Sequence, residues 1–365
     1  MLKLKFIMKI CILGNGLSSL TLAKNLINQG VKVDIFSDSL KNYYYKSQTI
    51  GISKSNVDYF NNNIININKL LWKIKNIEIY SQNLENEKIL NFKLDDQELF
   101  SIIKNFDLYN FLLSDLKKSK LFNFKKLKKN IADYRKYNLI INSDKNHSFT
   151  KKFFYKKIIK DYNSRAYITL IKHKKILNNT AVQFFTKNGP LAFLPSSSTE
   201  TSVVYSMRGK RNFKQSDYID LINKYSSNYK IKEIKIFNDF DLKSSNLRNY
   251  YHRNILAFGD LLHRLHPLAG QGFNMVLRDV KVLTDLIDYK ISLGIDLDKS
   301  VCSEFEKKIK SQNYLFSSGV DFIYEFFNIE SKIQSKFLSK SLQILGKNKS
   351  VNKLFIKFAD NGINI

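Results

Sequence analysis

The residues best suited to chemistry in this 365-residue chain gather in GDLLHRLHPLAGQGFN, which runs from Gly259 to Asn274. The stretch holds a carboxylate at Asp260, two histidines at His263 and His266, and three glycines. Histidines at this spacing suggest metal ligation, a single histidine suggests a general base, and clustered glycines suggest a backbone surface that a ligand can approach closely. The surrounding sequence must decide among these three chemistries.

The two histidines are weaker candidates than the glycines. A metal ion would need further ligands, and the best local candidates are only His252 and Asp260, so we assign no metal site. His266 precedes Pro267 in a turn, where an imidazole can act as a general base or can merely bond the backbone, and we favour the second role. No side chain is assigned as catalytic.

The glycines fit a binding surface better. Gly259 follows a buried strand predicted at 254–258 and lets a ligand approach, while Asp260 offers a carboxylate to hydroxyl groups rather than to phosphate. Pro267 stiffens the next turn. Apolar residues at helical spacing then predict a helix over 273–293.

That helix begins between Gly270 and Asn274. The free N–H groups and the dipole at its start would stabilise negative charge on a ring system.

A second glycine turn, GNGLSS, lies near the N-terminus between an apolar strand predicted at 7–13 and an amphipathic helix. It is a version of the G-x-G-x-x-G dinucleotide fingerprint, in which Gly14 makes the tight turn and Gly16 lets a pyrophosphate reach the helix start. Ser19 is small enough to replace the third glycine. The acid that should end the second strand and bind the ribose is replaced by Ser37.

The remaining elements must position these two turns. We predict strands at 31–36 and 139–141, an antiparallel sheet over 166–207, a helix over 99–116, and helices through 301–365. The apolar residues of 322–345 form either a surface for lipid or a partner, or a packed core. No linker separates the two sheet regions, so we expect one interleaved α/β body.

The composition bounds the class of protein. Hydrophobic residues make up 44% of the chain, and two cysteines are too few for a disulfide framework. So few cysteines favour a reducing compartment, and we expect a cytoplasmic protein. No window is apolar enough to span a bilayer. The net charge of +28 fits either an anionic membrane surface or compositional drift. Dispersed lysines without a recognition motif argue against nucleic acid as a partner.

Three stretches resemble motifs of the UbiH/UbiF-type FAD-dependent aromatic hydroxylases of ubiquinone biosynthesis. In this chain, GDLLHRLHPLAGQGFNMVLRD resembles the second flavin motif of that family. GPLAFLP resembles the family's G-P-x-A-x-L-P strand, and SDKNHS resembles its A-D-G-x-x-S segment. The resemblance implies a p-hydroxybenzoate hydroxylase-like fold, in which a Rossmann-like FAD-binding domain is interleaved with an antiparallel substrate-binding sheet and followed by helices. The boundaries we expect are 1–75, 100–165 and 250–300 for the FAD domain, 76–99 and 166–249 for the sheet, and 301–365 for the helical region.

The resemblance also implies which residues hold FAD. The ADP part would meet Gly14, Gly16 and Ser19, Asp144 would lie where its segment reaches the cofactor, and Asp260, beside Gly259, would bind the ribityl chain. Pro267 would belong to the same cofactor site, and the isoalloxazine would face the helix start at Gly270, Gln271, Gly272 and Asn274. The departures from the family pattern are Ser37, Gln48 in place of an arginine, Leu261 and Leu262 in place of alanines, and Lys145 in place of a glycine that can supply a positive φ.

By this resemblance the chain is a monooxygenase. NAD(P)H or a related donor would reduce FAD, and O2 would form a flavin C4a-hydroperoxide that hydroxylates the ring of a polyprenylated phenol. The implied partners are that phenol, O2, an anionic surface on the inner face of the cytoplasmic membrane, and other ubiquinone-biosynthesis proteins. Two alternatives stay open: a degenerate, non-catalytic relative that serves as a subunit of a biosynthetic complex, and an FAD hydroxylase of a soluble aromatic.

Overall fold

The computed structural model describes residues 8–41, 43–93, 97–127, 134–209, 213–266, 270–333 and 336–346, with positions 348, 353, 356, 357 and 360. The strands are β1 (Lys9–Leu13), β2 (Lys32–Ser37), β3 (Thr49–Ser53), β4 (Trp72–Ile74), β5 (Asn76–Ser81), β6 (Glu87–Lys93), β7 (Phe100–Lys104), β8 (Phe122–Lys126), β9 (Leu139–Asn142), β10 (Lys157–His173), β11 (Thr180–Thr186), β12 (Gly189–Pro195), β13 (Glu200–Arg208), β14 (Ile231–Ile234), β15 (Asn238–Leu247), β16 (Tyr251–His252), β17 (Ile255–Ala257) and β18 (His263–Arg264). The helices are α1 (Leu17–Asn28), α2 (Lys54–Tyr59), α3 (Asn105–Leu116), α4 (Ser148–Phe153), α5 (Gln215–Tyr225), α6 (Gln271–Ser292), α7 (Lys299–Ile333) and α8 (Phe337–Gly346).

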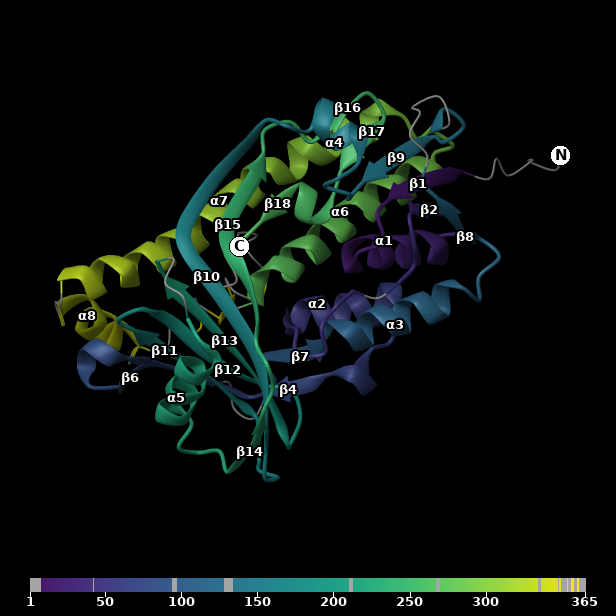
Figure 1. The fold of residues 1–365 in the computed structure, drawn as a ribbon. Coiled ribbons are helices and arrows are strands. Elements are labelled where there is room, and N and C mark those ends of the chain that lie inside the picture. The colour runs from purple at the N-terminus through teal and green to yellow at the C-terminus, as the bar shows by residue number, and fades with distance from the viewer. Residues whose placement is uncertain are drawn as a thin grey trace.

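The first sheet is a Rossmann-like layer. Its strands lie in the order β16-β17-β9-β1-β2-β8, and all neighbours are parallel except the pair β16/β17. The strands β1 and β9 are almost wholly buried and apolar, as expected for strands covered on both faces. Helix α1 connects β1 to β2 and packs against α6 (Figure 1). The glycine turn after β1 therefore lies at the carboxyl edge of this sheet.

Asp34 is the buried polar exception in β2. Asn123 and Tyr137 donate hydrogen bonds to its carboxylate at 2.9 and 2.6 Å, and Lys9 and Lys125 form ion pairs with it. Burial alone would raise the pKa of this carboxyl group, but the hydrogen bonds from Lys125, Tyr137 and Asn123 outweigh it and lower the pKa to about 2.

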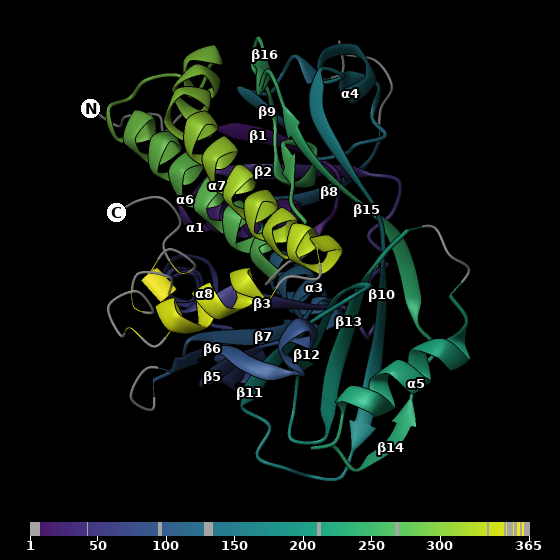
Figure 2. The same cartoon turned by 90° about the vertical axis from the view of Figure 1, so that its left-hand side faces the viewer.

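The second sheet is antiparallel apart from the pair β11/β5. Its order is β18-β15-β10-β13-β12-β11-β5-β6, and β14 also pairs with β10. The strands β10 and β15 are long and bent, with an irregularity between Asp161 and Ser164, and they reach toward the first sheet (Figure 1). Helix α5 packs on this sheet at the end away from the first sheet (Figure 2). The antiparallel sheet predicted over 166–207 is confirmed.

A small third sheet contains part of the segment predicted to be a helix over 99–116. It has the order β3-β7-β4, and its strand β3 lies against the start of α6. The helix predicted over 99–116 is wrong in its first part, because Phe100–Lys104 forms β7 and α3 begins only at Asn105. A short apolar run suits either structure, and here pairing with strands on both sides decides for β-structure.

From Gln271 onward the regular elements of the described residues are all helices. The helix predicted over 273–293 is confirmed as α6, and the predicted helical region continues as α7, which packs on α6, and α8, which packs on β6 (Figure 2). None of the helices in the described part of the chain has a stretch long and apolar enough to cross a membrane.

Candidate active site

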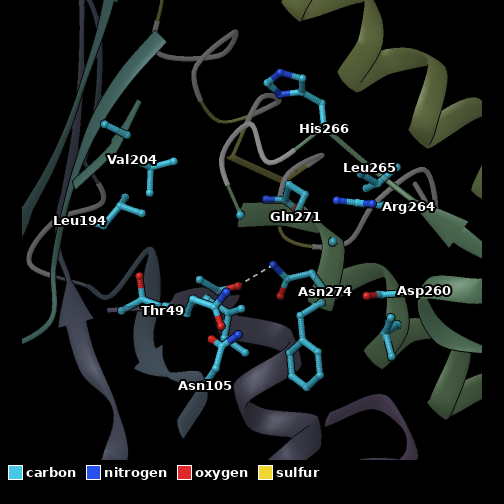
Figure 3. A pocket seen from close by; sticks show the side chains of 18 of the residues that line it. Thr49, Asn105, Leu194, Val204, Asp260, Arg264, Leu265, His266, Gln271 and Asn274 are labelled. Atoms are coloured by element: carbon cyan, nitrogen blue, oxygen red, sulfur yellow. Dashed lines mark hydrogen bonds between the residues drawn. The ribbon is translucent and has the colours of Figure 1, made fainter. Parts of the chain in front are cut away.

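A cavity of about 1100 Å³ lies between the turn after β1, the start of α6 and the antiparallel sheet (Figure 3). It joins two chemically different regions. One is polar and is formed by the turn 14–18, the segment 143–146 and the start of α6. The other is apolar and is lined from the sheet by Ile77, Ile79, Leu90, Phe92, Val182, Phe185, Leu194 and Val204.

The cavity gathers most of the residues predicted to bind a cofactor. Those that line it are Gly14, Gly16, Asp144, Asp260, Gly270, Gln271, Gly272 and Asn274. Ser19 and Gly259 are buried behind its wall. Pro267 lies outside the described residues. The cavity is also lined by three residues that depart from the family pattern, Ser37, Gln48 and Lys145. These substituted residues therefore face the same space as the residues that match the pattern.

The turn between β1 and α1 permits close backbone approach. Gly14 has a φ of +101°, and a Cβ at this position would lie 2.6 Å from Ser143 Oγ. Gly16 is the N-cap of α1, and the first helical residues line the cavity. The buried Ser19 hydroxyl lies 2.5 Å from Ser143 Oγ, which joins the first turn of α1 to the segment after β9. This turn thus presents a helix start to the cavity, as an anion site requires.

Tyr44 reaches this helix start, which the sequence did not reveal. The Leu17 N–H donates to the Tyr44 hydroxyl at 3.2 Å. Burial, and to a lesser extent the nearby Asp260 carboxylate, raises the pKa of Tyr44 to about 12, so its hydroxyl stays neutral. A phosphate that binds the start of α1 must share or displace this hydrogen bond. The run Tyr43 to Tyr45 has no periodicity that could have singled out Tyr44.

The segment after β9 forms a tight polar turn. Asp144 accepts a hydrogen bond from the Asn146 N–H at 2.8 Å, and its own N–H donates to Asn142 Oδ1 at 3.1 Å. Lys145 is exposed, and it is not among the non-glycine residues with positive φ. Replacement of a glycine by Lys145 therefore introduces no left-handed backbone strain in this turn.

Gly259 fixes the place of Asp260. Its φ is +63°, and a Cβ here would lie 2.5 Å from Ser18 Oγ, so only glycine lets this segment lie so close to α1. The following Asp260 is exposed on the cavity wall (Figure 3). Leu261 and Leu262, which replace small residues of the family pattern, are buried in the core.

The start of α6 is held tightly against β3. Gly270, its N-cap, has a φ of +64°, and a Cβ here would lie 3.2 Å from the Gly51 nitrogen. Asn274, only 2% exposed, donates to the Gly51 carbonyl at 2.9 Å and accepts from the Ser53 N–H at 2.9 Å (Figure 3). Its Oδ1 also accepts from Asn56 Nδ2 at 3.1 Å. The Asn274 side-chain amide thus uses its hydrogen bonds to hold in place the helix start that lines the cavity.

Gln271, the first residue of α6, leaves a polar atom unused. Its side-chain Oε1 is buried and has no hydrogen-bond partner among the described residues, although the residue lines the cavity. Buried acceptors are normally bonded, so an ordered water or a ligand is expected to supply the missing donor.

The two histidines of the motif have separate surroundings. His263 in β18 bonds to Asp279 of α6, and Asn313 of α7 donates to the other oxygen of that carboxylate at 3.1 Å. His263 therefore ties β18 to α6 and α7. His252 stacks on a phenylalanine ring, with 4.1 Å between the ring centroids. Within the described ranges no group of three or more His, Cys, Asp or Glu side chains is arranged to hold a metal ion.

His266 is buried at the cavity instead. It is 1% exposed and lies against the rings of Tyr162 and Tyr324, at centroid distances of 4.7 and 4.4 Å. Burial, and then the nearby Lys160, lowers the pKa of His266 to about 3, so its ring is neutral at physiological pH. The expected bond from this imidazole to the backbone is not found among the described residues.

The chain is similar in sequence to enzymes of ubiquinone biosynthesis. It is 25% identical over 182 residues to the ubiquinone hydroxylase UbiL of Rhodospirillum rubrum, a match that covers 46% of this chain and 41% of the relative. It is 28% identical over 153 residues to the 3-demethoxyubiquinol 3-hydroxylase of Escherichia coli, covering 40% and 39%. The match thus spans about two fifths of the length of these relatives. No protein-family model matches the chain.

Solved structures share the fold over nearly the whole chain. The p-nitrophenol 4-monooxygenase PnpA from Pseudomonas putida DLL-E4 has a TM-score of 0.79 at 12% identity, covering 98% of this chain and 99% of that one. HpxO of Klebsiella pneumoniae, in complex with FAD and uric acid, has a TM-score of 0.75 at 13% identity, covering 99% and 98%. The fold is that of the FAD-dependent monooxygenases. The fold class predicted from the sequence is confirmed, as is the resemblance to ubiquinone-biosynthesis hydroxylases.

Proposed function

We propose that the chain is an FAD-dependent monooxygenase that hydroxylates the aromatic ring of a polyprenylated phenol in ubiquinone biosynthesis. The observation that carries this proposal is a continuous cavity that runs from the glycine turns of a dinucleotide site into a large apolar region. A cofactor with phosphates and a polar ring suits the first region, and an isoprenoid chain suits the second. The similarity to the two ubiquinone-pathway hydroxylases supports the same reading.

The residues at the polar end fit FAD. In our proposal Gly14 and Gly16 give the ADP part access to the start of α1, and Asp144 lies beside it. The Asp260 carboxylate accepts hydrogen bonds from the ribityl hydroxyls. The N-terminus of α6 faces the isoalloxazine with the N–H groups of its first turn and with Gln271 Oε1, which has no partner among the residues that the structure describes.

FAD supplies the electron transfer and O2 chemistry that no side chain provides. The chain contributes charge stabilisation and exclusion of water. The dipole of the 22-residue helix α6 stabilises negative charge at the ring, and the buried Asn274 keeps this helix start in place. The apolar wall keeps water from the reacting centre. A reduced nicotinamide is the electron donor that we propose.

We further propose that the substrate enters from a membrane surface. Phe322 and Ile323 of α7 line the cavity, yet they are 68% and 40% exposed, so the apolar region meets solvent at this helix. Phe326, one turn further on, packs against the core cluster of Leu90 and Phe185. An exposed apolar edge on a chain of net charge +28 fits contact with anionic lipid on the inner face of the cytoplasmic membrane.

The activity is tested by mass spectrometry. Protein loaded with FAD is given NADH or NADPH, air and ortho-farnesylphenol, and the product is expected to gain one oxygen atom. Phenol without the farnesyl chain is the matched control and should react far more slowly, because it leaves the apolar region empty. Equal rates for both would favour a hydroxylase of soluble aromatics. Tight FAD binding without any product from either would favour a non-catalytic subunit.

A further inference from the structure

His266 carries two polar atoms that have no hydrogen-bond partner in the described part of the chain. Both ring nitrogens are buried, and neither has a hydrogen bond among the described residues. The two hydroxyls nearest the ring are engaged elsewhere. Tyr162 donates to Asp321, and the Tyr324 hydroxyl lies 2.8 Å from Ser164 Oγ. A buried polar group without a partner lowers the stability of the fold. A ligand that forms a hydrogen bond with the His266 ring would remove this cost.

The place of His266 identifies the kind of ligand. The residue lines the cavity from the segment that joins β18 to α6 (Figure 3), and the same cavity is lined by the start of α6 and by apolar side chains of the antiparallel sheet. Its neighbour Leu265 belongs to the apolar cluster with Phe185 and Met275. A molecule that reaches His266 must therefore be apolar over most of its length and carry a polar group at the end near α6.

The ring can accept a hydrogen bond. Burial keeps the imidazole neutral, and a neutral imidazole has one N–H donor and one acceptor nitrogen. A phenolic hydroxyl both donates and accepts, and it is the polar group of the proposed substrate. An edge-on contact with Tyr162 and a tilted contact with Tyr324 hold the ring in one orientation, which makes the acceptor directional.

We propose that His266 accepts a hydrogen bond from the ring hydroxyl of the phenol substrate and thereby orients the ring toward the start of α6. This inference rests on the proposed function. It makes His266 a residue that contacts substrate and that selects which ring carbon is presented for hydroxylation.

The proposal is tested by ligand discrimination in the FAD-loaded protein. The probes are ortho-farnesylphenol and its methyl ether, which has the same shape but no hydrogen-bond donor. Binding is followed through the flavin absorbance, without turnover. The wild-type protein should prefer the phenol by about fivefold to tenfold, as one net hydrogen bond provides.

Three variants separate the hydrogen bond from packing. His266→Phe keeps an aromatic ring between the two tyrosines but has no acceptor, and it should bind both probes equally, at the affinity of the wild type for the ether. His266→Asn retains an acceptor and should keep part of the preference. Tyr324→Phe, the matched control, removes a hydroxyl bonded to Ser164 and should keep all of it. A melting temperature within a few degrees of wild type confirms folding of each variant.

The contradicting results are distinct. If His266→Phe keeps the full preference for the phenol, or the wild type shows none, His266 does not accept the substrate hydroxyl. If FAD or both probes fail to bind the wild type, the proposed function itself is wrong. With turnover, His266→Phe should also hydroxylate a mixture of ring positions, and an unchanged single product would contradict the orienting role.

Discussion

The hydrogen bonds of Asn274 allow a sharp prediction about what holds the start of α6. The Asn274→Ala variant loses the bonds to the Gly51 carbonyl and the Ser53 N–H, both of 2.9 Å, and the bond from Asn56 at 3.1 Å. At about 1 kcal/mol each, the free energy of unfolding should fall by about 3 kcal/mol. FAD affinity should fall as well, because the helix start that faces the ring is no longer fixed to β3.

Urea unfolding of the apoprotein, followed by circular dichroism, measures the loss. The control is Asn56→Ala, which removes a bond to Asn274 and one to Ser53 Oγ but leaves Asn274 bonded to the β3 backbone. The Asn56→Ala variant should lower the free energy of unfolding by about 2 kcal/mol and leave FAD affinity nearly unchanged. If Asn274→Ala lowers the free energy of unfolding by less than Asn56→Ala does, Asn274 does not position α6. The same follows if the Asn274→Ala variant binds FAD as tightly as the wild type.

Three further changes test other parts of the site. Tyr44→Phe removes the acceptor of the Leu17 N–H, so FAD should bind about fivefold more tightly in a fluorescence titration; weaker binding would mean that the hydroxyl contacts the phosphate instead. Gly14→Ala places a Cβ 2.6 Å from Ser143 Oγ at a φ of +101°, and should cost about 2 kcal/mol or more of stability and most of the FAD affinity; normal FAD binding would refute the proposed ADP site. Asp34 has a pKa lowered to about 2, so it stabilises the fold above the ordinary carboxyl pKa and loses this contribution of about 2 kcal/mol as the pH falls from 4 to 2. Asp34→Asn should lack this component of the acid dependence of unfolding, and an unchanged slope would contradict the assignment.

The local sequence predicted the elements around both glycine turns well. Gly14 lies between the buried apolar strand β1 and α1, and Gly270 is the N-cap of the amphipathic helix α6, so the pattern of neighbouring residues alone could locate both turns. The structure adds why glycine is needed there, since both residues have positive φ and a close neighbour.

What the sequence could not predict depends on distant contacts. The run at Phe100–Lys104 becomes a strand because β3 and β4 pair with it, although its partner Thr49 in β3 lies 55 positions before Lys104 (104 − 49). Tyr44 meets Leu17 across a turn that has no periodicity. The role that we propose for His266 depends on distant contacts in the same way, because only the fold shows that the nearby tyrosine hydroxyls have other partners.

The central claim is that the cavity holds FAD with its ring at the start of α6, and a titration of the purified protein with FAD tests it most directly. We expect one FAD per chain, quenched flavin fluorescence, a higher melting temperature, and a shift of the flavin absorbance when ortho-farnesylphenol is added. A protein that neither quenches FAD nor gains thermal stability from it, while remaining folded by circular dichroism, would contradict the account.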